Sequence, residues 1–343
     1  MTKTSTTTTD TLDLRSGDWV EVRSVEEILA TLDDNGTLDH LPFMPEMASF
    51  CGKRFQVYQR ADRTCDTITM HGMRRMERTV HLKDSRCDGE CHGGCHAGCF
   101  LFWKEAWLRR VTPDKGDLPT VDAPSQRGNG QATRDRAWLE STTVQGRTGD
   151  GEVRYRCQAT ELRNASHPLP WWKPGQYFHD IFVNGVPWTH IVRGVAGRTI
   201  NKLRRRLTGR GYPDVAGPLD QTPVEDLGLQ AGEWVIVKSR EEIVATLDKN
   251  GKNRGMTFDG EMLPYCGKRF RVLRRVERII EESTGRMTEP RGVSVILENV
   301  FCRSLFRRPC PRCIFSYWRE IWLRRDPNQG PADGPSQLPV FNV

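Results

Sequence analysis

The chain has 343 residues, with 51 Lys plus Arg against 44 Asp plus Glu and a formal net charge of +7 at pH 7. That length suffices for two or three domains with cores of their own, and the charge is too small for a protein dedicated to nucleic acid. No stretch approaches the roughly 18 consecutive apolar residues of a membrane span.

The first ten residues, MTKTSTTTTD, are polar and have no apolar core. They predict a disordered tail over residues 1–11 instead of a signal peptide, so we expect a cytoplasmic protein. The chain holds eleven cysteines. Without an export signal, these favour thiols and metal-bound thiolates over disulfides.

The chain contains an internal repeat. Residues 12–110 align with residues 227–325 at a constant offset of 215, without a gap, and well over a third of the positions are identical. Residues kept in both copies indicate what the module itself requires. The predicted organisation is a first module at 12–111, a linker at 112–150, a helical insert at 151–212, a linker at 213–226, a second module at 227–326 and a tail at 327–343.

Each copy opens with a β pattern, Trp19–Val22 in the first, that leads into a helix signal. Ser24 followed by Glu27 is a capping-box pair, and the apolar residues after it supply an inner face. Asn35-Gly36 predicts a left-handed stop. The second copy repeats these signals with Trp234–Val237, Ser239 with Glu242, and Asn250-Gly251. Each helix is expected to span at most about three turns.

Short β patterns make up the rest of each copy. One strand holds Phe55 and Val57, a further strand holds Val80 and Leu82, and WKEAWLRR predicts the final strand. The second copy repeats them and ends in WREIWLRR. Short strands around one helix favour an α+β fold class, with two homologous small β-barrel-like (SH3-like) modules that flank the helical insert.

The middle of the chain belongs to neither copy. Residues 112–150 are rich in Pro, Gly, Asp, Ser and Thr and predict a linker that is at least partly disordered. The insert predicts one helix from near Pro174, with Ile181 and Phe182 on its inner face, and another from about Trp188 to Leu207.

Residues 198–210, RTINKLRRRLTGR, carry six basic residues and no acid. Aromatic residues before such a stretch are typical of helices that contact membranes or phosphate-rich partners, although a solvated basic face explains the pattern equally well. We expect a protein partner or a polyanionic surface, with peripheral membrane contact as an alternative. The residues expected to bind are Lys202, Arg204, Arg205 and Arg206.

Three cysteines keep their spacing in both copies. One lies in Cys-Gly-Lys-Arg, the second follows it by 36 residues, and the third follows after eight more. A fourth thiol lies close behind. Four thiolates predict a closed tetrahedral zinc site in each module. The predicted ligands are Cys51, Cys87, Cys95 and Cys99 in the first copy and Cys266, Cys302, Cys310 and Cys313 in the second. The alternatives are iron or an iron–sulfur cluster, and plain buried or redox thiols.

The loop CDGECHGGCHAGC sets the first copy apart, because it packs four cysteines and two histidines into 13 residues. Its secondary candidates as ligands are Cys91, His92 and His96, which have no counterparts in the second copy. Such a loop could hold a second ion or a redox-active metal with an open position. Its glycines predict a loop, so the spacing of the histidines does not indicate a helical ligand pair.

Other residues are candidates for catalysis. Glu46 and Glu261 occupy matching positions as acid/base groups or carboxylates behind a metal, although a structural ion pair with the nearby Lys53/Arg54 or Lys268/Arg269 is the commoner arrangement. Glu105 and Glu320 are likewise candidates either for acid/base groups or for structural ion pairs. Cys157 stands alone with His167, His179 and His190 after it, which leaves a Cys–His nucleophile pair open.

The segments GDWVEVRS, FCGKRF and LFWKEAWLRR of the first copy and YCGKRFRVLRRVERIIEESTGRM and YWREIWLRR of the second resemble a group of uncharacterised bacterial proteins, cysteine-rich and built from tandem repeats. The resemblance covers most of the chain, including PLPWWKPGQY, and implies no catalytic residue. The sequence thus favours a zinc-binding accessory or scaffold protein that presents a partner-binding surface. The alternative is a metal- or thiol-dependent enzyme of a bacterial biosynthetic pathway.

Overall fold

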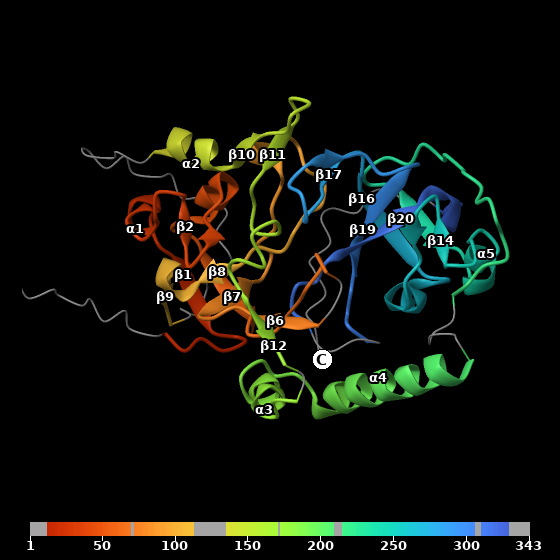
Figure 1. The fold of residues 1–343 in the computed structure, drawn as a ribbon, viewed down its shortest axis with the longest axis horizontal. Coiled ribbons are helices and arrows are strands. Elements are labelled where there is room, and N and C mark those ends of the chain that lie inside the picture. Colours follow the sequence, from red (N-terminus) through yellow and green to blue (C-terminus); the bar gives the residue numbers. More distant parts are fainter. Residues whose placement is uncertain are drawn as a thin grey trace, which may run out of the picture. The chain divides into compact units, whose positions relative to one another are not determined.

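The computed structural model describes residues 12–69, 72–112, 135–170, 172–208, 215–305 and 310–328. They form a mixed α+β fold of small antiparallel sheets with few helices, as the sequence predicts (Figure 1). The chain divides into two compact units: unit 1 holds residues 1–93, 100–185 and 282–286, and unit 2 holds 94–99, 186–281 and 287–343. The predicted tail at 1–11, most of the first linker and nearly all of the C-terminal tail lie outside the described residues.

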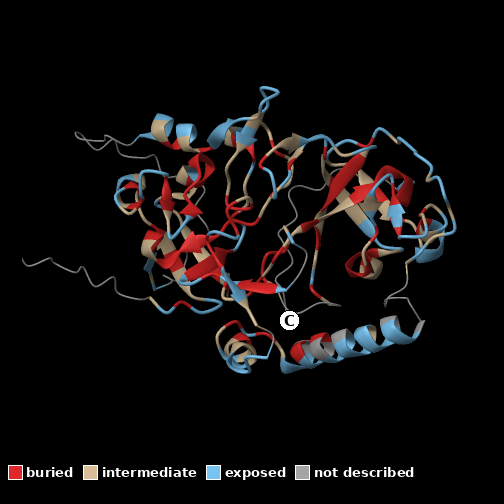
Figure 2. Ribbon diagram, viewed as in Figure 1, coloured by how far each residue is buried: buried red, intermediate tan, exposed pale blue. Residues whose placement is uncertain are grey.

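Unit 1 is built on a five-stranded antiparallel sheet with the order β8-β7-β4-β1-β9. Its strands are β1 (Trp19–Val22), β4 (Arg54–Arg60), β7 (Thr79–Leu82), β8 (Trp103–Lys104) and β9 (Leu108–Arg110). Val20, Val22 and Val57 are fully buried, and burial concentrates along these strands (Figure 2). The apolar residues at alternate positions of β1 therefore face the core, as the sequence predicts.

Unit 2 holds a five-stranded sheet of the same order, β20-β19-β16-β13-β21. Its strands are β13 (Trp234–Val237), β16 (Arg269–Arg275), β19 (Ser294–Phe301), β20 (Phe315–Arg319) and β21 (Leu323–Arg325). The strand pairing also recurs at the offset of 215. Trp19 pairs with Gln56 in the sheet of unit 1, and Trp234 pairs with Arg271 in the sheet of unit 2.

Shorter elements complete both units. The remaining strands are β2 (Thr37–Leu38), β3 (Leu41–Pro42), β5 (Thr64–Cys65), β6 (Met73–Arg75), β10 (Val144–Arg147), β11 (Val153–Tyr155) and β12 (His167–Leu169) in unit 1, and β14 (Lys252–Asn253), β15 (Met256–Thr257), β17 (Ile279–Ile280) and β18 (Met287–Thr288) in unit 2. The 3₁₀ turns are η1 (Pro45–Phe50), η2 (Glu90–His92), η3 (Glu105–Trp107), η4 (Gly260–Tyr265) and η5 (Glu320–Trp322).

The predicted capping boxes are confirmed, and the helices behind them end before the predicted Asn-Gly stop. Helix α1 (Val25–Leu29) follows Ser24, and helix α5 (Arg240–Val244) follows Ser239, each with both capping hydrogen bonds. Each helix spans five residues. The Asn35-Gly36 pair does not end α1. It lies in a separate turn, in which the Asp33 carboxylate accepts the Asn35 amide at 2.9 Å.

The predicted final strand is interrupted in both units. In unit 1, β8 and β9 are separated by η3, and η5 plays the same part before β21. Trp103 and Trp107 are both fully buried although they stand four residues apart. The intervening 3₁₀ turn bends the chain there, and Trp107 Nε1 donates to Thr31 Oγ1 at 3.0 Å.

The range predicted as a linker is not irregular throughout. Helix α2 (Arg136–Thr142) and strand β10 lie inside it. Asp135 caps α2 by accepting the Trp138 amide at 2.9 Å, and Leu139 is fully buried in the core of unit 1. The cap and the buried Leu139 thus lie in a segment whose average composition is polar.

The two predicted insert helices are present. Helix α3 (Gly175–Phe182) begins just after Pro174, and helix α4 spans Trp188–Thr208. The predicted inner face of α3 is wrong in part, because Phe182 is 74% exposed while Asp180 is buried. Asp180 Oδ2 lies 2.9 Å from Arg63 Nη2, and this buried ion pair sets the inner face instead. No helix in the described ranges is long and apolar enough to cross a membrane.

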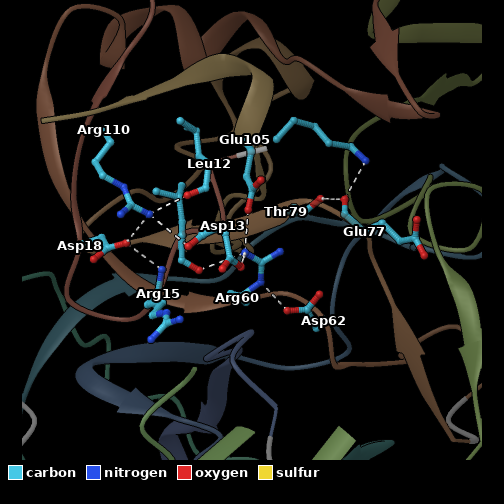
Figure 3. Close-up of polar contacts among 12 residues, drawn as sticks. Leu12, Asp13, Arg15, Asp18, Arg60, Asp62, Glu77, Thr79, Glu105 and Arg110 are labelled. Carbon is cyan, nitrogen blue, oxygen red and sulfur yellow. Dashed lines mark hydrogen bonds and ion pairs between the residues drawn. The ribbon is translucent and has the colours of Figure 1, made fainter. Parts of the chain in front are cut away.

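A buried ion pair joins distant parts of unit 1 (Figure 3). Arg60 Nη1 lies 2.6 Å from Glu105 Oε1 and donates to the Leu14 carbonyl at 3.0 Å, while Arg60 Nε lies 2.6 Å from Asp62 Oδ2. The Arg60 and Glu105 side chains are 9% and 4% exposed. Glu105 therefore has a structural partner, as its commoner interpretation predicts.

Unit 2 repeats this arrangement with Arg275, Glu320 and Leu229. Arg275 Nη1 lies 2.9 Å from Glu320 Oε1 and donates to the Leu229 carbonyl at 3.1 Å. Glu320 is fully buried, and its burial raises the pKa of its carboxyl group. In each unit the pair ties the 3₁₀ turn before the last strand to the central strand of the sheet.

We predict that Glu105→Ala and Glu320→Ala each lower the free energy of unfolding by about 3 kcal/mol or more, because each removes a buried carboxylate that pairs with an arginine of the central strand. Asp220→Ala is the control, since Asp220 and its partner Lys249 have side chains 82% and 72% exposed. It should change stability by no more than about 0.5 kcal/mol. Urea unfolding followed by circular dichroism measures all three, and equal effects of the buried and exposed substitutions would contradict the prediction.

Candidate metal centre

Glu46 is a carboxylate that the local fold removes from water. It lies in the 3₁₀ turn η1, next to Met47, which is fully buried in the core of unit 1. Glu46 itself is only 6% exposed. Removing an ionised carboxylate from water costs several kcal/mol or more unless a cation or hydrogen-bond donors compensate.

Two side chains from the cysteine loop meet this carboxylate. Cys87 follows strand β7, and His92 ends the 3₁₀ turn η2. Gly89 and Gly93 flank η2 with φ of +81° and +64°, a backbone conformation that glycine adopts most easily. These two glycines let the loop turn sharply and carry the imidazole back toward η1.

The three side chains converge on one point. Glu46 Oε1 lies 2.5 Å from His92 Nδ1 and 3.9 Å from Cys87 Sγ, and one ligand atom from each residue lies within 4.8 Å of the others. The His92 and Glu46 side chains are 1% and 2% exposed. Among the described residues this is the one group of three or more His, Cys, Asp or Glu side chains that could hold a metal ion.

The hydrogen bonding of His92 restricts what occupies this point. His92 Nε2 lies 3.1 Å from the carbonyl oxygen of Arg156, which can only accept a hydrogen bond, so Nε2 carries the proton. In a neutral imidazole the Nδ1 lone pair then faces the Glu46 carboxylate. Two lone pairs at that distance repel, so a proton lies between them, as in a hydrogen bond. A zinc ion in place of that proton would hold the two atoms roughly 3 Å apart or more, because each ligand atom lies about 2.0–2.2 Å from zinc. A backbone carbonyl on the far nitrogen is also the usual support of a metal-binding histidine.

Within the described residues, the second oxygen of Glu46, Oε2, has no hydrogen-bond partner. Among these residues, the contacts that offset the cost of burying the Glu46 carboxylate are therefore made through Oε1 alone. The donor set of one thiol sulfur, one imidazole nitrogen and one carboxylate oxygen suits zinc, which binds all three kinds of ligand.

Unit 2 supplies a comparison at the same positions. Glu261 is also buried, at 2% exposed, but its Oε2 accepts the backbone amide of Leu305 at 2.7 Å. The position that matches His92 is Arg307, whose placement lies outside the described residues. The carboxylate kept in both copies thus meets a histidine in one unit and a backbone amide in the other.

The structure does not bring either predicted set of four cysteines together as a group. All eleven cysteines are described, as thiols and not as disulfides. Cys87 lies with Glu46 and His92, whereas Cys95 belongs to unit 2, where its Sγ accepts the amide of Ile280 at 3.4 Å. No group of three metal-ligating side chains forms around Cys99, Cys302, Cys310 or Cys313 in the ranges that the structure describes.

Cys51 and Cys266 are packed against the cores of their units. Burial, with a smaller contribution from a nearby glutamate, raises the pKa of Cys51 to about 12 and that of Cys266 to about 11. Both shifts favour the neutral thiol. For these two residues the alternative of plain buried thiols accounts for the retained cysteine without a metal.

The remaining candidates lie at different places. His96 contacts residues of unit 2, with its amide donating to the Arg278 carbonyl at 2.9 Å and its Nδ1 accepting the Glu277 amide at 3.1 Å. The Cys157 amide donates to Thr160 Oγ1 at 3.0 Å. His92 Nε2 lies 3.1 Å from the carbonyl oxygen of Arg156, the residue before Cys157.

Sequence reasoning placed Glu46 in an ion pair with Lys53 or Arg54, and the contacts of Glu46 are instead with His92 and Cys87. A usable signal was present. Glu46 has a counterpart in the second copy and His92 has none, so the partner of this glutamate cannot be the same in both copies.

In comparisons with known proteins, no family model matches the chain, and neither a curated protein nor a solved structure is similar to it.

We predict that Cys51 and Cys266 resist alkylation in the native protein at pH 8, because pKa values of about 12 and about 11 leave roughly 10⁻⁴ and 10⁻³ of each thiol ionised. Iodoacetamide labelling followed by peptide mass spectrometry measures this, before and after treatment with a chelator. The same labelling in guanidinium chloride is the control, where both thiols should react. Rapid labelling of the native thiols once metal is removed would show that metal, and not burial, protects them.

Proposed function

We propose that the protein is a zinc-binding scaffold protein that holds one ion in unit 1 through Glu46, Cys87 and His92. The observation that carries the proposal is the convergence of Oε1, Nδ1 and Sγ around one point, with the far nitrogen of the imidazole held by a backbone carbonyl. A zinc ion would replace the proton between the Glu46 carboxylate and His92 Nδ1, with these two atoms moved roughly 3 Å apart or more.

Zinc fits this donor set better than an iron–sulfur cluster. Such clusters take thiolates at most or all of their protein positions, and this group contains one cysteine. Zinc accepts sulfur, nitrogen and oxygen together and imposes little geometric demand of its own. Iron bound as a single ion is the alternative that metal analysis distinguishes.

The role of the ion is structural. Its nitrogen and oxygen ligands are almost fully buried, which leaves a substrate no access to them. Three protein ligands are also found in catalytic zinc sites, but those keep their open position toward a cleft. An ion here would instead fasten the loop at 87–93 and the backbone at 156 to the core of unit 1.

The two units are, in this proposal, homologous modules of SH3-like type, and only the first keeps an ion. In unit 2 the amide of Leu305 compensates Glu261 in place of a metal. The pattern supports a module whose sheet folds without zinc and whose cysteine loop has acquired it in one copy.

We predict about one zinc ion per chain in protein purified without chelators, measured by elemental analysis. Cys87→Ala and His92→Ala should each reduce the metal content at least about tenfold, since loss of one of three ligands removes much of the binding free energy. Cys302→Ala is the matched control at the equivalent position of unit 2, and it should keep the ion.

Two results would contradict the proposal: folded wild-type protein without metal, or a Cys302→Ala variant that loses metal as completely as Cys87→Ala. A chelator provides a second readout. It should lower the melting temperature of the wild type and of Cys302→Ala but leave that of His92→Ala unchanged, because that variant has no ion to lose.

A further inference from the structure

Exposed apolar side chains are concentrated in one part of the chain. Ten large hydrophobic residues are exposed among the residues described, and eight of them lie between Trp172 and Leu207. Five belong to helix α4: Trp188, Val192, Ile200, Leu203 and Leu207, at 65%, 54%, 61%, 58% and 76% exposed. Single exposed apolar residues are common on proteins, but a concentration of this kind marks an interaction surface.

The five residues share one side of α4. Their successive separations are four, eight, three and four residues, so at about 100° per residue they fall within an arc of roughly 120°. A stripe of that width normally packs against a core. In α4 every one of these side chains is more than half exposed.

Basic residues border this stripe. On the same helical projection, Lys202 lies beyond one edge of the stripe, Arg206 at that edge and Arg204 beyond the other edge, and all three are exposed. From Ile181 to Pro213 the sequence contains seven Lys or Arg and no Asp or Glu. The segment that carries the apolar stripe therefore supplies basic residues and no acidic ones.

We propose that α4 docks on an anionic lipid bilayer, with the apolar stripe in the boundary between headgroups and acyl chains and the basic side chains at the headgroup phosphates. The combination of an apolar stripe with bordering basic residues favours an anionic bilayer over other partners. A nucleic acid or polyphosphate would neutralise Lys202, Arg204 and Arg206 but leave the stripe in water. A bilayer with anionic lipids satisfies both features, and long basic side chains reach headgroups while their stems lie on apolar surface.

The aromatic residue that begins α4 agrees with this placement. Trp188 is 65% exposed at the first position of the helix, and tryptophan favours the boundary between headgroups and acyl chains. The inference does not rest on the metal site, because no ligand of that site lies in α4. Failure of one proposal therefore leaves the other standing.

The test is cosedimentation of the full chain with extruded vesicles. Vesicles of phosphatidylcholine with about 30% phosphatidylserine should bind the protein, and binding should fall at least about tenfold with phosphatidylcholine alone. Leu203→Glu/Leu207→Glu should abolish binding, and Lys202→Gln/Arg206→Gln should weaken it and reduce its dependence on salt. Val224→Glu is the matched control, because Val224 is 51% exposed and lies outside α4.

Circular dichroism and thermal unfolding of each variant check folding, and Leu203→Asn/Leu207→Asn removes the apolar surface without added negative charge. The proposal is overturned if wild-type protein does not bind anionic vesicles, or if both apolar-stripe variants bind as the wild type does. Salt-sensitive binding to single-stranded RNA or polyphosphate without vesicle binding would also overturn it, and would assign the basic residues to a polyanion.

Discussion

The burial of the Glu46 carboxylate is the constraint on which the first unit depends. A side chain that is 2% exposed retains almost none of its hydration, so its charge needs compensation from within the protein. The loop after β7 supplies that compensation. Gly89 and Gly93 turn it back, His92 reaches Oε1, and the Arg156 carbonyl fixes the ring from behind. One compensated carboxylate thereby connects three segments that are far apart in the sequence.

In unit 2 the matching carboxylate, Glu261, has a different partner. Glu261 Oε2 accepts the backbone amide of Leu305 at 2.7 Å. The two five-stranded sheets share strand order and register regardless of this difference. Features common to both units, among them the Arg60–Glu105 and Arg275–Glu320 pairs, therefore accompany the shared sheet, whereas the contact of Glu46 with His92 belongs to the loop of the first.

Local signals in the sequence predicted local structure well. Ser24 and Ser239 cap their helices, Val20 and Val22 alternate as a half-buried strand does, and α4 spans almost the predicted residues. These features depend on neighbours within a few positions. The interrupted final strand was missed because the 3₁₀ turn at Glu105 depends on Arg60, a residue 45 positions away.

The sequence predicted metal sites made of four cysteines, whereas the one candidate group among the described residues is Glu46, Cys87 and His92. Spacing alone pointed to cysteines, because thiols are conspicuous and their intervals repeat. Tertiary packing then separates them: Cys51 is packed against the core of its unit, Cys95 belongs to unit 2, and Cys87 remains beside a carboxylate and an imidazole. The spacing of residues in the sequence does not predict which of several nearby side chains the loop places beside η1.

The most direct test of the central claim is the X-ray absorption spectrum of the zinc-loaded protein at the zinc edge. Coordination through Glu46, Cys87 and His92 predicts one sulfur at about 2.3 Å, with the remaining ligands nitrogen or oxygen at about 2.0–2.2 Å. A first shell of four sulfurs would contradict this site and would instead support a centre made from cysteines alone.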